Sequence, residues 1–338
     1  MKDSLIQWTD HTFNPWEGCA KVAPECKNCY AETLVNHRFG RVKWGTDQPR
    51  RRTSKAIWRQ PLRWNQFRIY ECPSCEHRHV VKIGDDTGGW ECECSSGCSI
   101  CRPRRPRVFC LSLGDWLDEA VNIGWLADLL EVIRITPDLD WQLLTKRPQN
   151  WESRLLSVEA ALTHLGLGED ELFLWVYDWL KGRAPENVWI GVSAGADQKA
   201  ALEIPAQIHF LSCEPMLHAL DEEQNHVTQE FDWIIFGGES GKNARPCNID
   251  WIRRGVEMCR FYGIAPFVKQ LGRRPYFLSG DAEISMRTNR HRDCDDVITD
   301  GHGGDMTEWP EDLRIREFPQ SQIANRKSQM EREAPPPR

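Results

Sequence analysis

The sequence lacks any long apolar run. No stretch of about 18 apolar residues occurs among its 338 residues, so a membrane-spanning helix is not expected. It also lacks the biased amino-acid composition of collagen-like, mucin-like or disordered chains, because 40% of its residues are hydrophobic and 28% are charged. The segment Met1–Trp8 has no apolar stretch of the kind that a secretory signal needs, which predicts a cytoplasmic protein.

Cysteine, in contrast, is abundant and unevenly placed. The chain has 14 cysteines, and ten of them lie between Cys19 and Cys110. In a reducing compartment, clustered thiols are expected to bind metal ions rather than to form disulfides.

Charge is uneven as well. The formal net charge is −7, yet residues 36–70 contain ten Lys and Arg against a single Asp, and a second basic run spans Arg102–Arg107. Trp44, Trp58 and Trp64 are interleaved with these cations, a composition that suits contact with phosphates and stacked bases. The alternative is a solvated face whose tryptophans pack inward.

Short apolar runs alternate with helical patterns from residue 108 onward. Near-continuous apolar runs are typical of parallel strands that are buried on both faces. With an earlier candidate at 6–13, they predict an α/β fold, a full or partial TIM-like (β/α) barrel. The six later runs are 108–113, 141–144, 188–192, 209–211, 233–236 and 266–268. Helical spacing of apolar residues covers 117–133 and 252–259.

The end of each predicted strand is polar. In barrels of this kind the carboxyl ends of the strands form the active site, so a shared polar mouth is expected. The alternative is that each strand simply becomes polar as it leaves the core. The residues at these ends are Asp115, Lys146, Arg147, Ser193, Glu214, Glu239, Ser240, Lys269 and Gln270. Asp115, Lys146, Glu214 and Glu239 are the predicted catalytic residues.

The first cysteine group is Cys19-x6-Cys26-x2-Cys29. Three closely spaced thiolates suit a 4Fe–4S cluster that keeps one iron open for a ligand. An open iron is what a radical S-adenosylmethionine (SAM) enzyme needs. The alternative is a structural Cys3His zinc site completed by His37 or His11.

The Gly-Gly-Glu-Ser sequence after the fifth of these runs is the second part of the predicted cofactor site. Gly237, Gly238, Glu239 and Ser240 are expected to bind SAM or substrate, with the Glu239 carboxylate receiving an ammonium group. A tight turn is the alternative explanation of the two glycines.

A second cysteine group fits a zinc ribbon. Cys72-x2-Cys75 and Cys98-x2-Cys101 are two knuckles that can direct four thiolates at one zinc ion. Residues 80–83 and 88–90 would form the hairpin between them. Cys92 or Cys94 could replace a member of the second knuckle, or bind a second ion together with His77 and His79.

Taken together, these motifs resemble a known family. The resemblance is carried by 8–10, 14–15, 18–32, 61–65, 144–148, 189–193, 211–215, 237–241, 244–246 and 268–270. They resemble the bacteriophage-associated "gp thirty-seven/sixty-eight" family, a domain of unknown function with a three-cysteine motif and a radical-SAM-like barrel. The resemblance covers nearly the whole chain outside 71–107 and the tail. The first gap of the cysteine motif is x6 here, where radical-SAM enzymes commonly have x3.

The sequence therefore predicts four parts. Residues 1–70 hold the first strand, the cysteine motif and the basic segment, and 71–107 form a zinc-ribbon insertion. Residues 108–318 complete the barrel, and 319–338 form a disordered tail. The expected function is a radical-SAM-like iron–sulfur enzyme that acts on nucleic acid or a nucleotide and takes electrons from a donor. The alternative is a zinc-dependent nucleic-acid-binding protein without catalytic activity.

Overall fold

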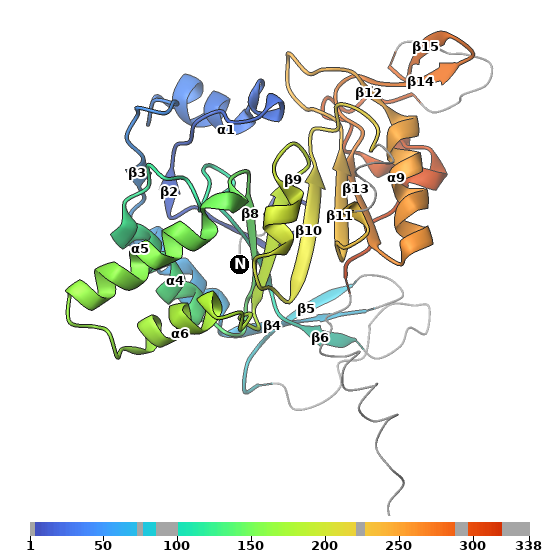
Figure 1. Ribbon diagram of the computed structural model, residues 1–338. Helices are drawn as coiled ribbons and strands as arrows, with labels where there is room; N and C mark the ends of the chain where they lie inside the picture. Colours follow the sequence, from blue (N-terminus) through green and yellow to red (C-terminus); the bar gives the residue numbers. More distant parts are fainter. Residues whose placement is uncertain (1–3, 73–76, 86–100, 221–226, 288–296, 320–338) are drawn as a thin grey trace, which may run out of the picture. The chain divides into compact units, whose positions relative to one another are not determined.

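A computed structural model describes the chain except residues 1–3, 73–76, 86–100, 221–226, 288–296 and 320–338 (Figure 1). The chain forms two compact units. The first contains Met1–Ala20, Leu34–Leu144 and Asn150–Trp189, and the second contains Lys21–Thr33, Thr145–Gln149 and Ile190–Arg338. The predicted tail lies outside the described residues except for its first residue.

The seven predicted apolar runs form the seven strands of one parallel sheet, which confirms this part of the prediction. The strands are β1 (His11–Phe13), β7 (Arg107–Cys110), β8 (Asp140–Thr145), β9 (Val188–Ser193), β10 (Ile208–Cys213), β11 (Trp233–Gly237) and β13 (Ala265–Gln270). Their order is β1-β7-β8-β9-β10-β11-β13. The order does not return from β13 to β1 within the described residues, so it is that of an open half-barrel in a mixed α/β fold.

The first unit contains β1, β7 and β8, paired in parallel. Its longer helices are α4 (Ile123–Arg134), α5 (Trp151–His164) and α6 (Glu171–Leu180). The helical pattern predicted from residue 117 becomes a helix only at α4. The side chain of Asn122 accepts a hydrogen bond from the Gly124 backbone N–H and so fixes the start of α4. Leu117 and Val121, which precede this cap, are nevertheless buried.

Several short elements complete the first unit. They are β2 (Trp16–Glu17), the π-helical turn η2 (Thr33–Arg38), β3 (Arg51–Arg52), α2 (Lys55–Trp58), α3 (Gln60–Trp64), β4 (Phe67–Glu71), β5 (Arg78–Lys82), β6 (Arg102–Arg104) and the 3-10 turn η3 (Pro148–Asn150), which extends from the second unit. The last three strands named before η3 form a small antiparallel sheet in the order β5-β4-β6.

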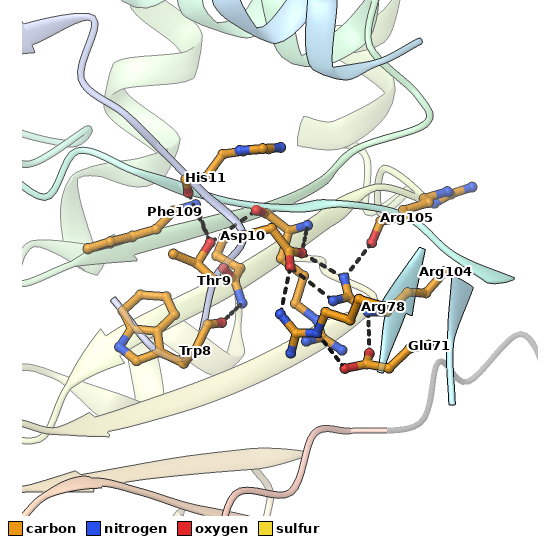
Figure 2. A network of polar contacts seen from close by, with 11 residues as sticks. Trp8, Thr9, Asp10, His11, Glu71, Arg78, Arg104, Arg105 and Phe109 are labelled. Carbon is orange, nitrogen blue, oxygen red and sulfur yellow. Dashed lines mark hydrogen bonds and ion pairs between the residues drawn. The ribbon is translucent and has the colours of Figure 1, made fainter. Parts of the chain in front are cut away.

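An ion-pair network joins this small sheet to the start of β1 (Figure 2). Arg104 donates to both oxygens of the buried Asp10 carboxylate, at 2.6 and 2.9 Å, and to Glu71 at 2.6 Å. The Arg107 backbone N–H also donates to Asp10, at 2.8 Å. Burial alone would raise the pKa of Asp10, but Arg104 and Arg107 lower it to about 2. Arg78 adds contacts to Glu71 and Asp10 at 2.9 and 3.5 Å.

The second unit contains β10, β11 and β13, also paired in parallel. Its helix α9 (Ile249–Tyr262) lies beside β13 and contacts both β11 and β13 (Figure 1). Ile252, Val256 and Cys259 of the helix belong to the same buried apolar cluster as Phe236 and Val268 of the sheet. The Asn248 side chain caps the start of this helix, and it ends at Gly263 with φ +71°. The predicted helix at 252–259 is thereby confirmed.

The other elements of the second unit are short. They are η1 (Pro24–Cys26), α1 (Tyr30–Glu32), α7 (Gln198–Leu202), β12 (Cys247–Asn248), β14 (Pro275–Ser279), β15 (Ala282–Ser285), η4 (Met306–Glu308) and η5 (Glu311–Leu313). Among the helices that the structure describes, none combines the length and the apolar character needed to span a membrane.

Candidate active site

The carboxyl ends of the strands in the second unit carry several of the predicted polar residues. Lys146 Nζ donates to Ser193 Oγ, which joins the segment after β8 to the end of β9. The ends of β10 and β13 are joined by an ion pair of 2.7 Å between Glu214 Oε1 and Lys269 Nζ. The second unit therefore brings Lys146 to Ser193 and Glu214 to Lys269, whereas a single polar mouth shared by all the strand ends stays a prediction.

Gly237, the last residue of β11, and Gly238, which follows it, allow close packing at this strand end. A Cβ on Gly238 would lie 2.2 Å from the Leu271 carbonyl oxygen, and a Cβ on Gly237 would lie 2.8 Å from Glu214 Oε1. The Gln270 side chain donates to the Gly238 carbonyl at 2.8 Å. A larger residue at Gly238 would push the two backbones apart, whereas at Gly237 it would displace the Glu214 side chain.

Glu239, which follows these glycines, is almost fully buried and has several partners. Arg245 donates to Oε1 at 2.8 Å and to Oε2 at 3.1 Å, and its backbone N–H donates to Oε2 at 2.7 Å. Asn28 donates to Oε2 at 3.0 Å. Burial would raise the pKa of Glu239, but these donors lower it, so the carboxylate is ionised and already paired with a cation. Ser240, the next residue, is half-buried.

Through these contacts, Glu239 fixes the cysteine-bearing loop. Asn28 lies in that loop and also donates to the Asn243 carbonyl at 2.9 Å. Arg245 Nη1 donates to the carbonyl of Pro24, at the start of η1, at 3.0 Å. The segment from Pro24 to Asn28 is thus held to the loop after β11 from both of its ends.

Replacing Arg245 by Met is expected to release this segment. The change removes the contacts to Glu239 and Pro24, so backbone amides of residues 25–29 should exchange with deuterium roughly tenfold faster. The exposed Arg254 of α9 offers a matched control, and its replacement by Met should leave exchange in the loop unchanged. Hydrogen exchange followed by mass spectrometry would measure both variants. Equal protection of the loop in wild type and Arg245→Met would refute the role of Arg245.

Cys26 and Cys29 lie in this held segment. Both thiols are half-buried. Burial raises the pKa of Cys29 and the neighbouring Cys26 raises it further, whereas backbone N–H groups of Glu32 and Ala31 and the charge of Lys146 act in the opposite direction. The Cys29 sulfur therefore has donors and a cation ready to stabilise a metal-bound thiolate.

Cys19 and Asp115 belong to the first unit. Cys19 Sγ lies 3.4 Å from the Ala20 carbonyl. The buried Asp115 accepts the Leu117 backbone N–H at 3.0 Å and so shapes the turn after β7. Within the part of the chain that the structure describes, no group of three or more His, Cys, Asp or Glu side chains forms a metal-binding arrangement.

Two of the predicted zinc ligands, Cys72 and Cys101, lie at opposite positions next to the ends of neighbouring strands of the small sheet. β4 pairs antiparallel with β6, with Glu71 opposite Arg102. The same register places Cys72 opposite Cys101, and both are buried in one cluster with Tyr70 and Val81. Cys75, Cys92, Cys94 and Cys98 lie outside the described residues, as does 88–90. The other half of the predicted hairpin, β5, pairs with β4.

Many cations of the two basic stretches are paired within the first unit. Arg50 and Asp118 form a fully buried ion pair of 2.8 Å. Further pairs are Arg41–Glu17, Arg51–Glu17, Arg52–Asp128, Arg68–Asp138, Arg104–Asp10 and Arg105–Asp140. Arg52 also stacks on Trp58, 4.4 Å from its ring centre. These contacts account for much of the positive charge that the sequence displays, so fewer cations are available for phosphates than the count suggests.

Three residues of this site were not singled out from the sequence. Asn28 and Arg245 lie inside the motifs. Nothing in their spacing predicts that both bind the Glu239 carboxylate, which is 211 residues from Asn28 in the sequence. Glu25 adjoins Cys26, and its side chain approaches Gly195 so closely that a Cβ there would lie 2.2 Å from Oε1. Only the adjacency of Glu25 to the cysteines could have marked it.

Comparison with known proteins gives one match. No curated protein and no solved structure matches the chain. A family model described as "Protein of unknown function (DUF5131)" matches residues 3–301, which include both cysteine groups and every strand of the parallel sheet. The chain therefore belongs to the uncharacterised DUF5131 family.

Proposed function

We propose that this protein is an iron–sulfur enzyme of the radical-SAM type. In this proposal Cys19, Cys26 and Cys29 hold a 4Fe–4S cluster, and SAM binds beside it. The observation that carries the proposal is the attachment of the segment with Cys26 and Cys29 to Glu239, at the polar ends of parallel strands. A purely structural thiol site does not need charged residues such as Glu239 and Arg245 next to it.

The residues present fit such a cluster. Three thiolates match the preference of iron–sulfur clusters for soft sulfur donors. Around Cys29, the backbone N–H groups of Ala31 and Glu32 and the ammonium of Lys146 favour negative charge on sulfur. When bound, a cluster of this kind supplies one electron to the sulfonium of SAM.

The residues of the chain would bind and orient the ligand. Lys146, held by Ser193, supplies a positive charge near Cys29, and Glu214 with Lys269 supplies a polar pair on neighbouring strands. The buried Cys213, at the end of β10 beside Glu214, would help to exclude water from the reaction. The proposed substrate is nucleic acid or a nucleotide, and an electron donor is the expected partner.

We also propose that the insertion binds zinc through Cys72, Cys75, Cys98 and Cys101. The register that sets Cys72 opposite Cys101 supports this ligand set, because the knuckles of a ribbon must bring their thiolates to one ion. The alternative ligand set has Cys92 or Cys94 binding the zinc ion in place of Cys98 or Cys101. A zinc ion would give this short segment stability that its small core cannot supply.

Anaerobic reconstitution with iron and sulfide tests the proposal. Wild type should hold roughly four iron and four sulfide per chain plus about one zinc ion. Cys26→Ala should lose the iron and keep the zinc, whereas Cys259→Ala, on the buried face of α9, should keep both. A colourless protein that holds only zinc, unchanged by Cys26→Ala, would favour the zinc-dependent nucleic-acid-binding alternative.

A further inference from the structure

One carboxylate oxygen in the cysteine loop is buried without a hydrogen-bond partner. Oε2 of Glu25 is inaccessible to solvent, and neither a hydrogen bond nor an ion pair reaches Glu25 from any residue that the structure describes. Leaving a buried acceptor unsatisfied is costly, and native proteins rarely keep one without a purpose. This oxygen can therefore accept a hydrogen bond from a bound ligand, because no described residue donates one to it.

The other strand-end carboxylates of the second unit are already paired. Glu239 has Arg245 and Asn28, and Glu214 has Lys269. An incoming cation would have to displace an existing partner at either of them. At Glu25 it would displace no side chain that the structure describes, so a cationic ligand group gains most there.

Glu25 is directed toward the ends of β9 and β10. Both of its carboxylate oxygens would lie within 2.4 Å of a Cβ on Gly195, two residues beyond the end of β9. Its negative charge contributes to raising the pKa of the buried Cys213 thiol, at the end of β10, although burial is the main cause. The carboxylate thus lies among the strand ends and not on the outer surface of the loop.

We infer that Glu25 receives the ammonium group of the ligand that binds at these strand ends. Under the proposed function, on which this inference rests, the ligand is SAM and the group is its α-amino group. Glu239 then acts as a positioning residue that holds the loop bearing Glu25 and the cysteines. Gly195 is needed because any side chain there would expel the Glu25 carboxylate.

Binding of SAM to the reconstituted protein tests this assignment by equilibrium dialysis. Glu25→Gln should weaken binding between roughly 10-fold and 100-fold, because it removes a charge-assisted hydrogen bond. Gly195→Ala should weaken SAM binding similarly, because the added methyl displaces the Glu25 carboxylate. The backbone can stay in place, since only the flexible end of the Glu25 side chain must move. Glu32→Gln is the matched control in the same loop, since Glu32 is already paired with Lys21 at 2.7 Å, and it should bind as wild type does. 5′-Methylthioadenosine, which lacks the amino group, should bind wild type and Glu25→Gln equally.

Two further readouts separate the possible failures. All variants should retain wild-type iron, and ligand-free Glu25→Gln should melt no lower than wild type, because it removes the charge of a carboxylate that has one unsatisfied buried oxygen. A melting temperature several degrees lower would identify Glu25 as a structural residue and overturn the assignment. Unchanged SAM affinity in Glu25→Gln would overturn the assignment alone. Wild type that holds the cluster yet binds no SAM would overturn the proposed function together with it.

Discussion

Replacing Asp10 by Asn is expected to lower the free energy of unfolding by about 3 kcal/mol at pH 7. The Asp10 side chain is 6% exposed and accepts two bonds from Arg104 and one from the Arg107 backbone. Asn keeps the shape but removes the charge, so Arg104 loses one of its two carboxylate partners while it stays largely buried. The midpoint of urea unfolding measures the loss.

The loss should depend on pH in a defined direction. The pKa of Asp10 is about 2 in the folded protein, below its ordinary value of 3.8, so its contribution is present above pH 4 and disappears as pH falls toward 2. The difference between wild type and Asp10→Asn should therefore shrink between pH 4 and pH 2.

Asp140, which pairs with Arg105 next to this network, provides the matched control. Burial raises its pKa to about 6, despite the opposing charges of Arg105 and Arg107, so the fold favours its neutral form. Asp140→Asn imitates that form and should leave stability at pH 7 unchanged or slightly higher. A constant difference between wild type and Asp10→Asn from pH 7 to pH 2 would contradict the role given to Asp10.

Replacing Gly238 by Ala is the second change with a large expected effect. The added methyl would lie 2.2 Å from the Leu271 carbonyl oxygen and 2.9 Å from Gly272 Cα, so backbone rather than a flexible side chain must move. We expect a loss of about 3 kcal/mol in the free energy of unfolding. Because Glu239 is the next residue, the loop held by Asn28 and Arg245 should also lose protection from hydrogen exchange.

Gly301 is the matched control for Gly238. A Cβ there meets nothing within 4 Å, so Gly301→Ala should change the urea midpoint by less than roughly 0.5 kcal/mol. If Gly238→Ala is as stable as Gly301→Ala, the close approach of the strand ends is not a requirement of this fold.

The strands were predictable from sequence because each apolar run is buried on both faces. β9 and β11, for example, have every residue buried, and this requirement leaves an unbroken apolar signal. Polar residues at the strand ends were predictable for the same reason, since the core ends where the strand ends. The start of α4 was not, because Leu117 and Val121 are buried from a turn and imitate helical spacing.

Partnerships between distant residues could not be predicted from the sequence. The pairing of Glu239 with Asn28 depends on where the chain places two loops, and no spacing encodes it. The basic segment illustrates the same limit, because a count of cations does not reveal that Arg50 is buried against Asp118. Local composition predicts that a charge exists, but only the fold determines which carboxylate it meets.

Reductive cleavage of SAM tests the proposed function most directly. The reconstituted protein, reduced with dithionite under anaerobic conditions, should convert SAM to methionine and 5′-deoxyadenosine, and Cys29→Ala should abolish the conversion. Chromatography of the products would measure it. A brown wild-type protein that contains iron and sulfide yet forms no 5′-deoxyadenosine, or a protein that holds zinc alone, would contradict the assignment of this chain as a radical-SAM enzyme.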